Sequence, residues 1–396
     1  MPKIVHMTSV HRTYDTRIFI KECGSLVAAG YDVVLVAAHG RDELAANGVR
    51  IRGEGIPRPA GIWRRWFLTV PQVMRAALRE RADVYHFHDP ELVIPGLLLR
   101  LAGHEVIYDV HEHVPAAIRT KHYIPSIIRK PLAAIVDVVE RLASVGMSGV
   151  VATSAPIAQR FDAKKTVLID NFALSEEFRA ARTGHPYMER PYWITYVGLI
   201  SDEHGVIQTL DAIALLADKY DLRLQLGGPF ANQSIETTLR SHRMWSRVDY
   251  HGYMSRQEML EIFSRTRLGV VLYQPTPNNV VTSANKVFEN MAAGLPVLAS
   301  NFKTRSEVID GVGCGITVDP TSPAAIAEGI DRLFSHPDEA LAMGRRAAAA
   351  IDESFSWESQ MPKLTALYEK LISRTRGAAQ PMVAQGASRT IQGTRS

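Results

Sequence analysis

Residues 268–299 read LGVVLYQPTPNNVVTSANKVFENMAAGLPVLA, and this stretch decides the fold class. The short apolar run Leu268–Leu272 predicts a buried strand. Residues 284–293 predict a helix, and Pro296–Ala299 predict a second strand. A strand, a helix and a strand in this order form a right-handed unit whose two strands are parallel. The stretch therefore predicts an α/β protein.

The same alternation of short apolar runs and helical patterns extends in both directions from this stretch. It is interrupted once, by a polar segment with Gly184, Pro186 and Pro191 that is typical of a linker. The sequence thus predicts two Rossmann-like, doubly wound α/β domains at residues 1–175 and 192–356, with a linker at 176–191. A helix is predicted at 357–375 and a disordered basic tail at 376–396. Ligands bind beyond the carboxyl ends of such strands, so both domains are expected to face one cleft.

Composition excludes several other classes of protein. The chain has 396 residues, of which 46% are hydrophobic and 22% charged, as in globular proteins. The net charge of +4 equals that of the four arginines in segment 374–396, which has no acidic residue. The rest of the chain is therefore formally neutral, so a protein dedicated to binding nucleic acid is not expected. Only Cys23 and Cys314 are present, which excludes a disulfide framework. Without a signal peptide or a run of about 20 apolar residues, a cytoplasmic protein is expected.

The segment between the two quoted strands suits an anion. The first N–H groups of a helix, here those of Ser283, Ala284 and Asn285, have no partner within the helix and favour negative charge. Lys286 adds a cation, and Glu289, one turn later, suits hydrogen bonds from a vicinal diol such as ribose. The alternative is an ordinary amphipathic helix whose lysine and glutamate are in water. The spacing alone leaves both interpretations open.

The pattern Lys-x-x-Glu-x-Met-Ala-x-Gly-x-Pro-Val at 286–297 resembles the signature of the retaining nucleotide-sugar glycosyltransferases of family 4, which have the GT-B fold. Motifs at 196–198, 226–228 and 251–253 occur in the order found in that family. In the first half, residues 10–33, 86–91 and 108–112 resemble the branch found in bacterial surface-polysaccharide gene clusters. The resemblance extends over residues 3–372 and depends on the ordered set of motifs.

The resemblance implies roles for particular residues. His111, Lys286 and Glu289 are the expected catalytic residues, with Glu289 binding the donor ribose and His111 lying near the donor sugar. The expected donor site lies on second-domain loops and on the quoted helix, at Gly198, His204, Gly228, Tyr253, Ser283, Ala284, Asn285 and Glu289. The expected acceptor side comprises Thr16, Arg17, His88 and Asp89. The helix at 357–375 is expected to return to the first domain.

Three positions depart from the family's pattern. Val281 stands where the family has the first glutamate of Glu-x7-Glu, Leu199 where it has an arginine, and His204 where it has a lysine or arginine. Lys286 is expected to supply part of the missing positive charge, together with Arg17 from across the cleft. A neutral histidine is not a cation, so a weaker diphosphate clamp is predicted.

A metal site is the competing hypothesis for the histidines. His86 and His88 share one face of a strand, and His111 and His113 follow the next strand, so with Asp89 they could bind zinc. Against this, His-x-His is common at strand ends, the sequence has no Asp-x-Asp for a diphosphate-bound Mg²⁺, and the family that it resembles works without metal. No metal or other cofactor is predicted.

Two segments combine apolar and basic residues, at 63–67 and 122–130. Such segments either contribute to the core or contact the surface of a membrane. Both lie in the half that the resemblance assigns to the acceptor. The predicted partners are therefore a nucleoside-diphosphate-sugar and a glycan or lipid-linked glycan, with peripheral contact to the inner face of the cell membrane as a further hypothesis and no nucleic acid.

Together these observations predict a retaining glycosyltransferase that moves a sugar from a nucleoside-diphosphate donor to a sugar hydroxyl. The resemblance implies a front-face reaction without a protein nucleophile. Two alternatives stay open: a nucleotide-sugar epimerase of the same fold, and a catalytically silent partner subunit. A hydride-transferring Rossmann enzyme is disfavoured, because no Gly-x-Gly-x-x-Gly follows the strand at Lys3–Thr8.

Overall fold

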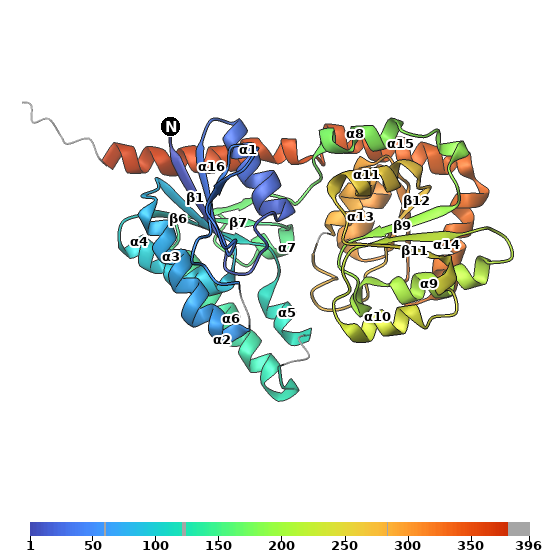
Figure 1. The fold of residues 1–396 in the computed structure, drawn as a ribbon, viewed down its shortest axis with the longest axis horizontal. Coiled ribbons are helices and arrows are strands. Elements are labelled where there is room, and N and C mark those ends of the chain that lie inside the picture. The colour runs from blue at the N-terminus through green and yellow to red at the C-terminus, as the bar shows by residue number, and fades with distance from the viewer. Residues whose placement is uncertain (59–60, 121–123, 283, 379–396) are drawn as a thin grey trace, which may run out of the picture.

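The structure is a computed structural model that describes residues 1–58, 61–120, 124–282 and 284–378. It contains two α/β units, each built on its own parallel sheet (Figure 1). The prediction of two doubly wound domains is confirmed. The central strands of each sheet are almost entirely buried, which explains why they read as continuous apolar runs, whereas the outer strands β3, β8, β11 and β14 contain no buried residue.

The first sheet has eight strands in the order β3-β4-β2-β1-β5-β6-β7-β8. Every pair is parallel except β3 with β4. The carboxyl ends of β1, β5 and β6 therefore lie side by side, and they carry the polar residues described below. The strands are β1 Lys3–Met7, β2 Asp32–Val36, β3 Glu43–Leu44, β4 Arg50–Arg52, β5 Val84–Phe87, β6 Glu105–Val110, β7 Gly149–Ala152 and β8 Thr166–Leu168.

Helices cover both faces of the first sheet. One hydrophobic core joins one face to α3, α4, α6 and α7, and another joins the opposite face to η1, α1 and α16. The segments are η1 Thr16–Cys23, α1 Gly24–Ala28, α2 Ile62–Arg64, η2 Arg65–Thr69, α3 Val70–Arg79, η3 Pro90–Leu92, α4 Val93–Leu101, α5 Val114–Thr120, α6 Ser126–Gly146 and α7 Ala155–Ala158. Within the described residues, no helix is both long enough and apolar enough to span a bilayer.

The second sheet has six parallel strands in the order β11-β10-β9-β12-β13-β14. The quoted stretch forms β12, α12 and β13, as predicted, and Gly269 of β12 pairs with Val297 of β13. The strands are β9 Trp193–Val197, β10 Arg223–Gly227, β11 Val248–Gly252, β12 Leu268–Val271, β13 Val297–Ser300 and β14 Gly315–Val318. The helices are η5 Asp202–His204, α9 Val206–Leu216, α10 Gln233–Arg240, η6 Trp245–Arg247, α11 Arg256–Arg265, α12 Asn285–Ala292, α13 Lys303–Val312, α14 Pro323–Ser335 and α15 Pro337–Glu353.

The segment predicted as a linker is more ordered than its composition indicated. It contains α8 Ser175–Thr183 and η4 Tyr187–Glu189. Phe178 and Ala181 of α8 are buried in the core formed with α11 and α12, so this segment is part of the second domain. Two buried residues in a polar segment are a weak periodic signal, which explains why the helix was missed.

The last helix, α16 Trp357–Ala378, packs against the first domain (Figure 1). Leu364, Tyr368 and Leu371 lie in the same core as Ile4 of β1 and Val84 of β5. The indole Nε1 of Trp357 donates a hydrogen bond of 2.9 Å to Ser25 Oγ. The chain therefore connects the two domains twice. The predicted disordered tail begins within this helix, and from residue 379 onward it lies outside the described residues.

Candidate functional site

The start of α12 is the place where the sequence predicts free backbone N–H groups. Ala284 precedes the helix with extended backbone (φ −82°, ψ 111°), and no side chain caps the helix start. The side-chain oxygen Oδ1 of Asn285 is buried and has no hydrogen-bond partner among the described residues. Ser283 lies outside the described residues. A helix start with unused donors favours an anion.

Lys286 lies beneath the loop that follows β9. Its Nζ donates a hydrogen bond of 3.1 Å to Tyr273 Oη and lies 5.6 Å from the ring centroid of Tyr196. A Cβ atom on Gly198 would stand only 2.5 Å from this Nζ, so the lysine position requires glycine there. Burial opposes the charge, but the Tyr273 oxygen and the Glu289 carboxylate outweigh it and raise the pKa of Lys286. Lys286 is therefore a half-buried side chain that stays charged.

Gly198 and Gly228 bring the loops after β9 and β10 into direct contact. Both have positive φ angles, +146° and +120°, which favour glycine. A Cβ atom on Gly228 would lie 1.9 Å from the carbonyl oxygen of Gly198. The glycines predicted for the donor site thus allow two backbones to approach each other above Lys286.

His204 occupies the position where the family pattern has a cation. Its Nδ1 donates to the carbonyl oxygen of Leu199 at 2.6 Å, and its ring lies 4.6 Å from that of Tyr273. Burial, with the nearby charge of Lys286, lowers the pKa of His204 to about 4. The imidazole is therefore neutral at pH 7 and supplies no positive charge to this site.

Arg305, on α13, is a second cation near Tyr273, and sequence reasoning missed it. It is 1% exposed, and its Cζ lies 4.9 Å from the ring centroid of Tyr273. Nη2 donates to the carbonyl of Asn279 at 3.1 Å, whereas Nε and Nη1 have no hydrogen-bond partner among the described residues. Burial lowers the pKa of Arg305 to about 10, so it is charged at neutral pH. A buried cation with unused donors favours an anionic partner.

Glu289 lies one turn after Lys286 and is 8% exposed. Its Oε1 is 3.4 Å from Nη1 of Arg256, which also binds Glu177 through a hydrogen bond of 2.5 Å from Nε. Lys21 of the first domain lies close enough to Glu289 for the charge of this carboxylate to affect the pKa of the lysine. Burial lowers the pKa of Lys21 to about 8, and the charge of Glu289 opposes that shift. Glu289 thus faces the first domain between two basic side chains.

Tyr253 marks a second point at which the two domains approach each other. It follows β11 and is 72% exposed, and the Cζ of Arg12 from the first domain lies 5.2 Å from its ring centroid. Cation–π geometry of this kind attracts a guanidinium to the ring face. The loops after β1 and β11 are therefore neighbours.

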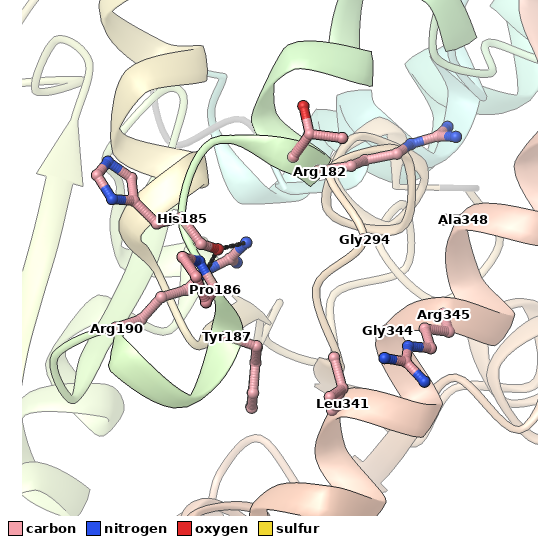
Figure 2. Close-up of a pocket in the computed structure, with 11 residues that line it drawn as sticks. Arg182, His185, Pro186, Tyr187, Arg190, Gly294, Leu341, Gly344, Arg345 and Ala348 are labelled. Atoms are coloured by element: carbon pink, nitrogen blue, oxygen red, sulfur yellow. Dashed lines mark hydrogen bonds between the residues drawn. The ribbon is translucent and has the colours of Figure 1, made fainter.

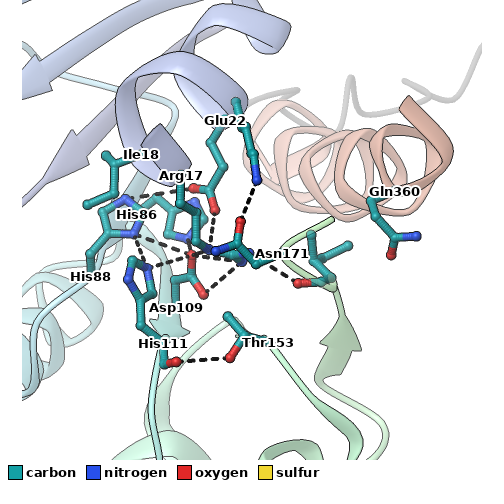
Figure 3. A network of polar contacts seen from close by, with 12 residues as sticks. Arg17, Ile18, Glu22, His86, His88, Asp109, His111, Thr153, Asn171 and Gln360 are labelled. Atoms are coloured by element: carbon teal, nitrogen blue, oxygen red, sulfur yellow. Dashed lines mark hydrogen bonds and ion pairs between the residues drawn. The ribbon is translucent and has the colours of Figure 1, made fainter. Parts of the chain in front are cut away.

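His111, which follows β6, is held by a buried network in the first domain (Figure 3). Its Nε2 lies 3.1 Å from Asp109 Oδ2 and 3.0 Å from His88 Nδ1. Arg17 donates to both oxygens of Asp109, at 3.2 Å each. Burial opposes ionisation of Asp109, but Arg17 outweighs it and holds the pKa of Asp109 well below its usual range. The histidine side chain is therefore oriented by a buried anion.

The network continues from His88 as a row of ring contacts. His88 Nε2 lies 2.9 Å from His6 Nδ1, and Tyr368 Oη of α16 lies 3.2 Å from His6 Nε2 and 2.5 Å from His86 Nδ1. Burial lowers the pKa of His88 to about 4 and also lowers the pKa values of His6 and His86. Neutral imidazoles carry one donor and one acceptor each, so each of these contacts can be a hydrogen bond, while Nε2 of His86 has no hydrogen-bond partner among the described residues.

The residues predicted for the acceptor side have mainly structural surroundings. Thr16 begins η1 and is half-buried. Arg17 is 4% exposed, and its remaining donor Nη1 binds the carbonyl of Ile169 at 3.2 Å. Asp89 accepts hydrogen bonds from Thr8 Oγ1 at 2.8 Å and from the Ser9 backbone N–H at 2.5 Å. The expectation that Arg17 supplies charge across the cleft is corrected, because Asp109 and Glu22 already hold its guanidinium inside the first domain.

A metal-like cluster exists, but it differs from the predicted one. One atom each of Glu22, His86, His88 and Asp109 lies within 4.8 Å of the others, all buried. Arg17 Nε lies 3.0 Å from Glu22 Oε1 and 3.2 Å from Asp109 Oδ2, so a cation already stands between the carboxylates. His113 lies apart and accepts a hydrogen bond from the Ala116 N–H at 3.2 Å. The guanidinium supplies the charge that a metal ion would bring.

A pocket of about 310 Å³ lies at the opposite end of α12 (Figure 2). Gly294, Tyr187 and Gly344 are among its lining residues. The donors of Arg190 bind backbone carbonyls, those of His185 at 2.9 and 3.0 Å and that of Thr266 at 2.9 Å. This is the carbonyl end of the helix, where the macrodipole disfavours an anion. The pocket is therefore separate from the predicted donor site.

Two family models match the chain, one in each half. Residues 22–169 match the model described as "Glycosyl transferase 4-like domain", and residues 178–350 match "Glycosyl transferases group 1". Among curated proteins, a glycogen synthase of Mycobacterium tuberculosis is 24% identical over 90% of both chains. An alpha-D-kanosaminyltransferase of Streptomyces kanamyceticus is 24% identical over 46% of each chain.

Solved structures share the fold at low identity. The sucrose-phosphate synthase of Thermosynechococcus elongatus superimposes with a TM-score of 0.75 and 18% identity, covering 94% of this chain and 100% of that one. Anabaena HepE, crystallised in complex with UDP and glucose, superimposes with a TM-score of 0.69 and 13% identity over 93% of this chain and 100% of its own. The predicted GT-B architecture is confirmed.

Proposed function

Since the chain is a family 4 glycosyltransferase with the GT-B fold, we propose that it moves a sugar from a nucleoside-diphosphate-sugar to a sugar hydroxyl, with retention at the anomeric carbon. The proposed acceptor is a polysaccharide or a lipid-linked oligosaccharide. Support for the nucleotide-sugar comes from the fold, because Anabaena HepE was crystallised with UDP-glucose and a starch synthase from Arabidopsis thaliana with ADP.

One observation carries the proposal: two cations, the half-buried Lys286 and the buried Arg305, converge on Tyr273 beside the start of α12. Lys286 reaches the phenol oxygen, and Arg305 lies against the ring with two donors unused. A diphosphate would satisfy these donors and the free N–H groups of the helix together. Glu289, one turn further along α12, would then accept hydrogen bonds from the ribose diol.

The proposed reaction needs no nucleophile from the protein. The bond between the anomeric carbon and the diphosphate oxygen breaks, and the acceptor oxygen bonds to the same face of that carbon. The acceptor's proton passes to the departing diphosphate oxygen. Lys286, Arg305 and the α12 amides would stabilise the negative charge that develops on the diphosphate, and His111 would hydrogen-bond a hydroxyl of the donor sugar. No metal is required in this scheme.

The position of His204 favours a second candidate function, that of a catalytically silent partner subunit. The neutral imidazole, together with Val281 and Leu199, removes three polar groups of the family pattern. A subunit of this kind would bind a nucleotide-sugar or a glycan without transferring sugar. Arg305 argues against it, because a buried cation in this place restores part of the lost charge.

A panel of UDP-, GDP- and ADP-sugars tests the proposal. We expect one nucleotide to raise the melting temperature, since a ligand at a hundred times its Kd stabilises by about 2.7 kcal/mol. With that donor and an oligosaccharide acceptor, NMR should show a product with the donor's anomeric configuration. Turnover of the donor without acceptor, giving its epimer, would identify an epimerase. Nucleotide binding without turnover on any acceptor would favour the silent subunit.

A further inference from the structure

The first domain exposes an unusual amount of apolar surface on one side. The helices α3, α4 and α6 share a core on the same face of the first sheet, and α2 and η2 continue α3 toward its N-terminal end. The outward sides of these helices carry large apolar side chains that are more than one third exposed: Ile62, Trp63, Trp66, Phe67, Leu68, Leu78, Ile94, Leu98, Leu101, Ile127, Ile128, Ile135, Val138, Val139, Leu142 and Val145. We call these residues the outer helix face.

The helices of the outer helix face are neighbours. Arg100 of α4 donates from Nε to the carbonyl oxygen of Gly146 in α6 at 3.3 Å. An ion pair joins Arg65 of η2 to Glu91, which directly precedes α4. Figure 1 shows α2, α3, α4 and α6 grouped on the same side of the first domain. The exposed side chains therefore form one surface, and large exposed apolar surfaces on a protein mark sites of interaction.

Spacing along α6 and α4 shows that this surface is not an accident of frayed ends. Ile128, Ile135 and Leu142 are seven residues apart, and Val138 and Val145 repeat that spacing beside them. On α4, Ile94, Leu98 and Leu101 follow helical spacing. Each helix therefore has a second apolar stripe, opposite the one that packs on the sheet. In the described residues nothing covers these outer stripes.

Basic side chains surround the apolar ones. Arg75, Arg79 and Arg81 line a shallow depression of about 590 Å³ with Pro71, Met74 and Leu78. Arg64 and Lys130 are exposed nearby on α2 and α6. Among the described residues, none of these five cations has a carboxylate within 4.0 Å. The surface thus combines apolar side chains with unpaired positive charge.

The combination of apolar and basic side chains indicates what kind of partner binds the outer helix face. A second copy of the chain, docked around a twofold axis, would bring the same unpaired cations against one another, which is unfavourable. A bilayer with anionic headgroups would neutralise them and also accept the apolar side chains. Trp63, Trp66 and Phe67 beside Arg64 are the types of residue that favour the boundary between headgroups and acyl chains.

We propose that the outer helix face binds the surface of a bilayer that contains anionic lipid, with the aromatic residues of α2 and η2 inserted at the headgroup level. The protein would then lie on the membrane through its first domain alone. This inference goes beyond the proposed function and does not depend on it, because binding to lipid is measured without donor or acceptor.

Co-sedimentation with vesicles tests the inference. The full chain should bind vesicles of phosphatidylcholine and phosphatidylglycerol, and should bind pure phosphatidylcholine much more weakly. Added salt should weaken the binding, because exposed charges are screened. In the double variant Arg75→Glu/Arg79→Glu, vesicle affinity should fall by about tenfold or more, given about 1 kcal/mol for each basic residue at an anionic surface. In the separate variant Trp63→Ser/Phe67→Ser it should also fall by about tenfold or more, because two exposed aromatic side chains no longer insert at the headgroup level.

Two matched variants on the second domain serve as controls. Leu215→Ser removes an apolar side chain of similar exposure, and Arg243→Glu reverses an exposed charge. Neither should alter vesicle binding. Failure of the wild-type chain to bind vesicles that contain phosphatidylglycerol would overturn the inference. So would a dimer, detected by light scattering, that Trp63→Ser/Phe67→Ser dissociates, since the surface would then belong to a second copy.

Discussion

At the scale of single residues, the proposed site depends on two cations, one buried and one half-buried, that form no ion pair with a carboxylate among the described residues. Lys286 and Arg305 approach the same tyrosine ring from α12 and α13, and His204 beside them is neutral. Removing a cation from water is costly unless a partner restores its interactions. Replacing such a cation should therefore weaken binding of the anionic ligand but raise the stability of the free protein. A residue with a purely structural role would not show this combination.

Arg305→Met should weaken binding of the preferred nucleoside diphosphate by about tenfold or more, as loss of a charged hydrogen bond does. Affinity for the corresponding nucleoside should stay the same, because it lacks the diphosphate. The melting temperature should rise, since a methionine removes an unpaired buried charge. Isothermal calorimetry and thermal unfolding measure the two effects. Lys303→Met, on the exposed side of α13, is the control; a lower melting temperature with unchanged affinity would make Arg305 a structural residue.

Glu289→Gln should weaken nucleotide binding by about 1–3 kcal/mol, because an amide accepts hydrogen bonds from a diol less strongly than a carboxylate. Arg256 also contacts Glu289, so the loss could arise indirectly. Glu177→Gln removes the other carboxylate on Arg256 and leaves Glu289 in place. Calorimetry should show a loss only for Glu289→Gln. Equal losses in both variants would assign the effect to Arg256.

His111→Ala should lower turnover by about 10²-fold, the usual cost of one preorganised hydrogen-bond donor. Nucleotide affinity should persist, because the second domain holds the base and ribose in the proposed scheme. The same assay in EDTA should run at the wild-type rate. Loss of activity in EDTA that zinc restores would instead assign a metal to Glu22, His86, His88 and Asp109.

At the scale of the elements, the ends of β1, β5 and β6 are joined to α16 by the buried histidine row. The pKa of His88 is about 4 in the folded protein, against an ordinary value of 6.5, so the unfolded chain binds more protons between these values. The contribution of His88 to the free energy of unfolding is therefore fully present above pH 6.5 and is lost as the pH drops toward 4. Since one pKa unit corresponds to 1.36 kcal/mol, His88 alone should contribute about 3 kcal/mol to this loss.

Urea unfolding at pH 7.5 and at pH 5 measures the effect. The wild type should lose more stability between these values than His88→Asn, whose amide does not titrate. Burial raises the pKa of Glu22, which works in the opposite direction in both proteins. Because the pKa values of His6 and His86 are lowered by burial and also by the charge of His88, the difference between the two proteins reports on the buried histidine row as a whole. Identical pH dependence in the two proteins would contradict the neutral state assigned to the row.

At the scale of the whole molecule, α16 places residues from the end of the chain in the core of the first domain. Leu364→Ala should cost about 2–5 kcal/mol, the range for a fully buried leucine. Hydrogen exchange should show lost protection in β1 and β5 and unchanged protection in β9 and β10. Leu210→Ala, in the core of the second domain, should give the reverse pattern. Lost protection in both domains of either variant would show that they unfold as one unit.

The sequence by itself determined most of the strands and helices, including the helix proposed to bind the diphosphate. The central strands are buried, so their apolar runs are visible without any contact map, and the α12 motif places Lys286 and Glu289 one turn apart on one helix. Segments whose burial depends on distant partners were less visible. Helix α8 has a polar sequence, and only the core that it meets on α11 and α12 explains its structure.

Tertiary structure alone decided which charges are available to a ligand. Arg17 reads as a loop arginine that could reach across the cleft, but Asp109, ninety-two residues away, holds it inside the first domain. Arg305 reads as an ordinary helix residue, yet folding buries it against Tyr273 with donors unused. Local periodicity of the sequence encodes secondary structure. Whether a charged side chain is available to a ligand depends instead on its neighbours in space and on its burial, and these are fixed only when distant segments pack.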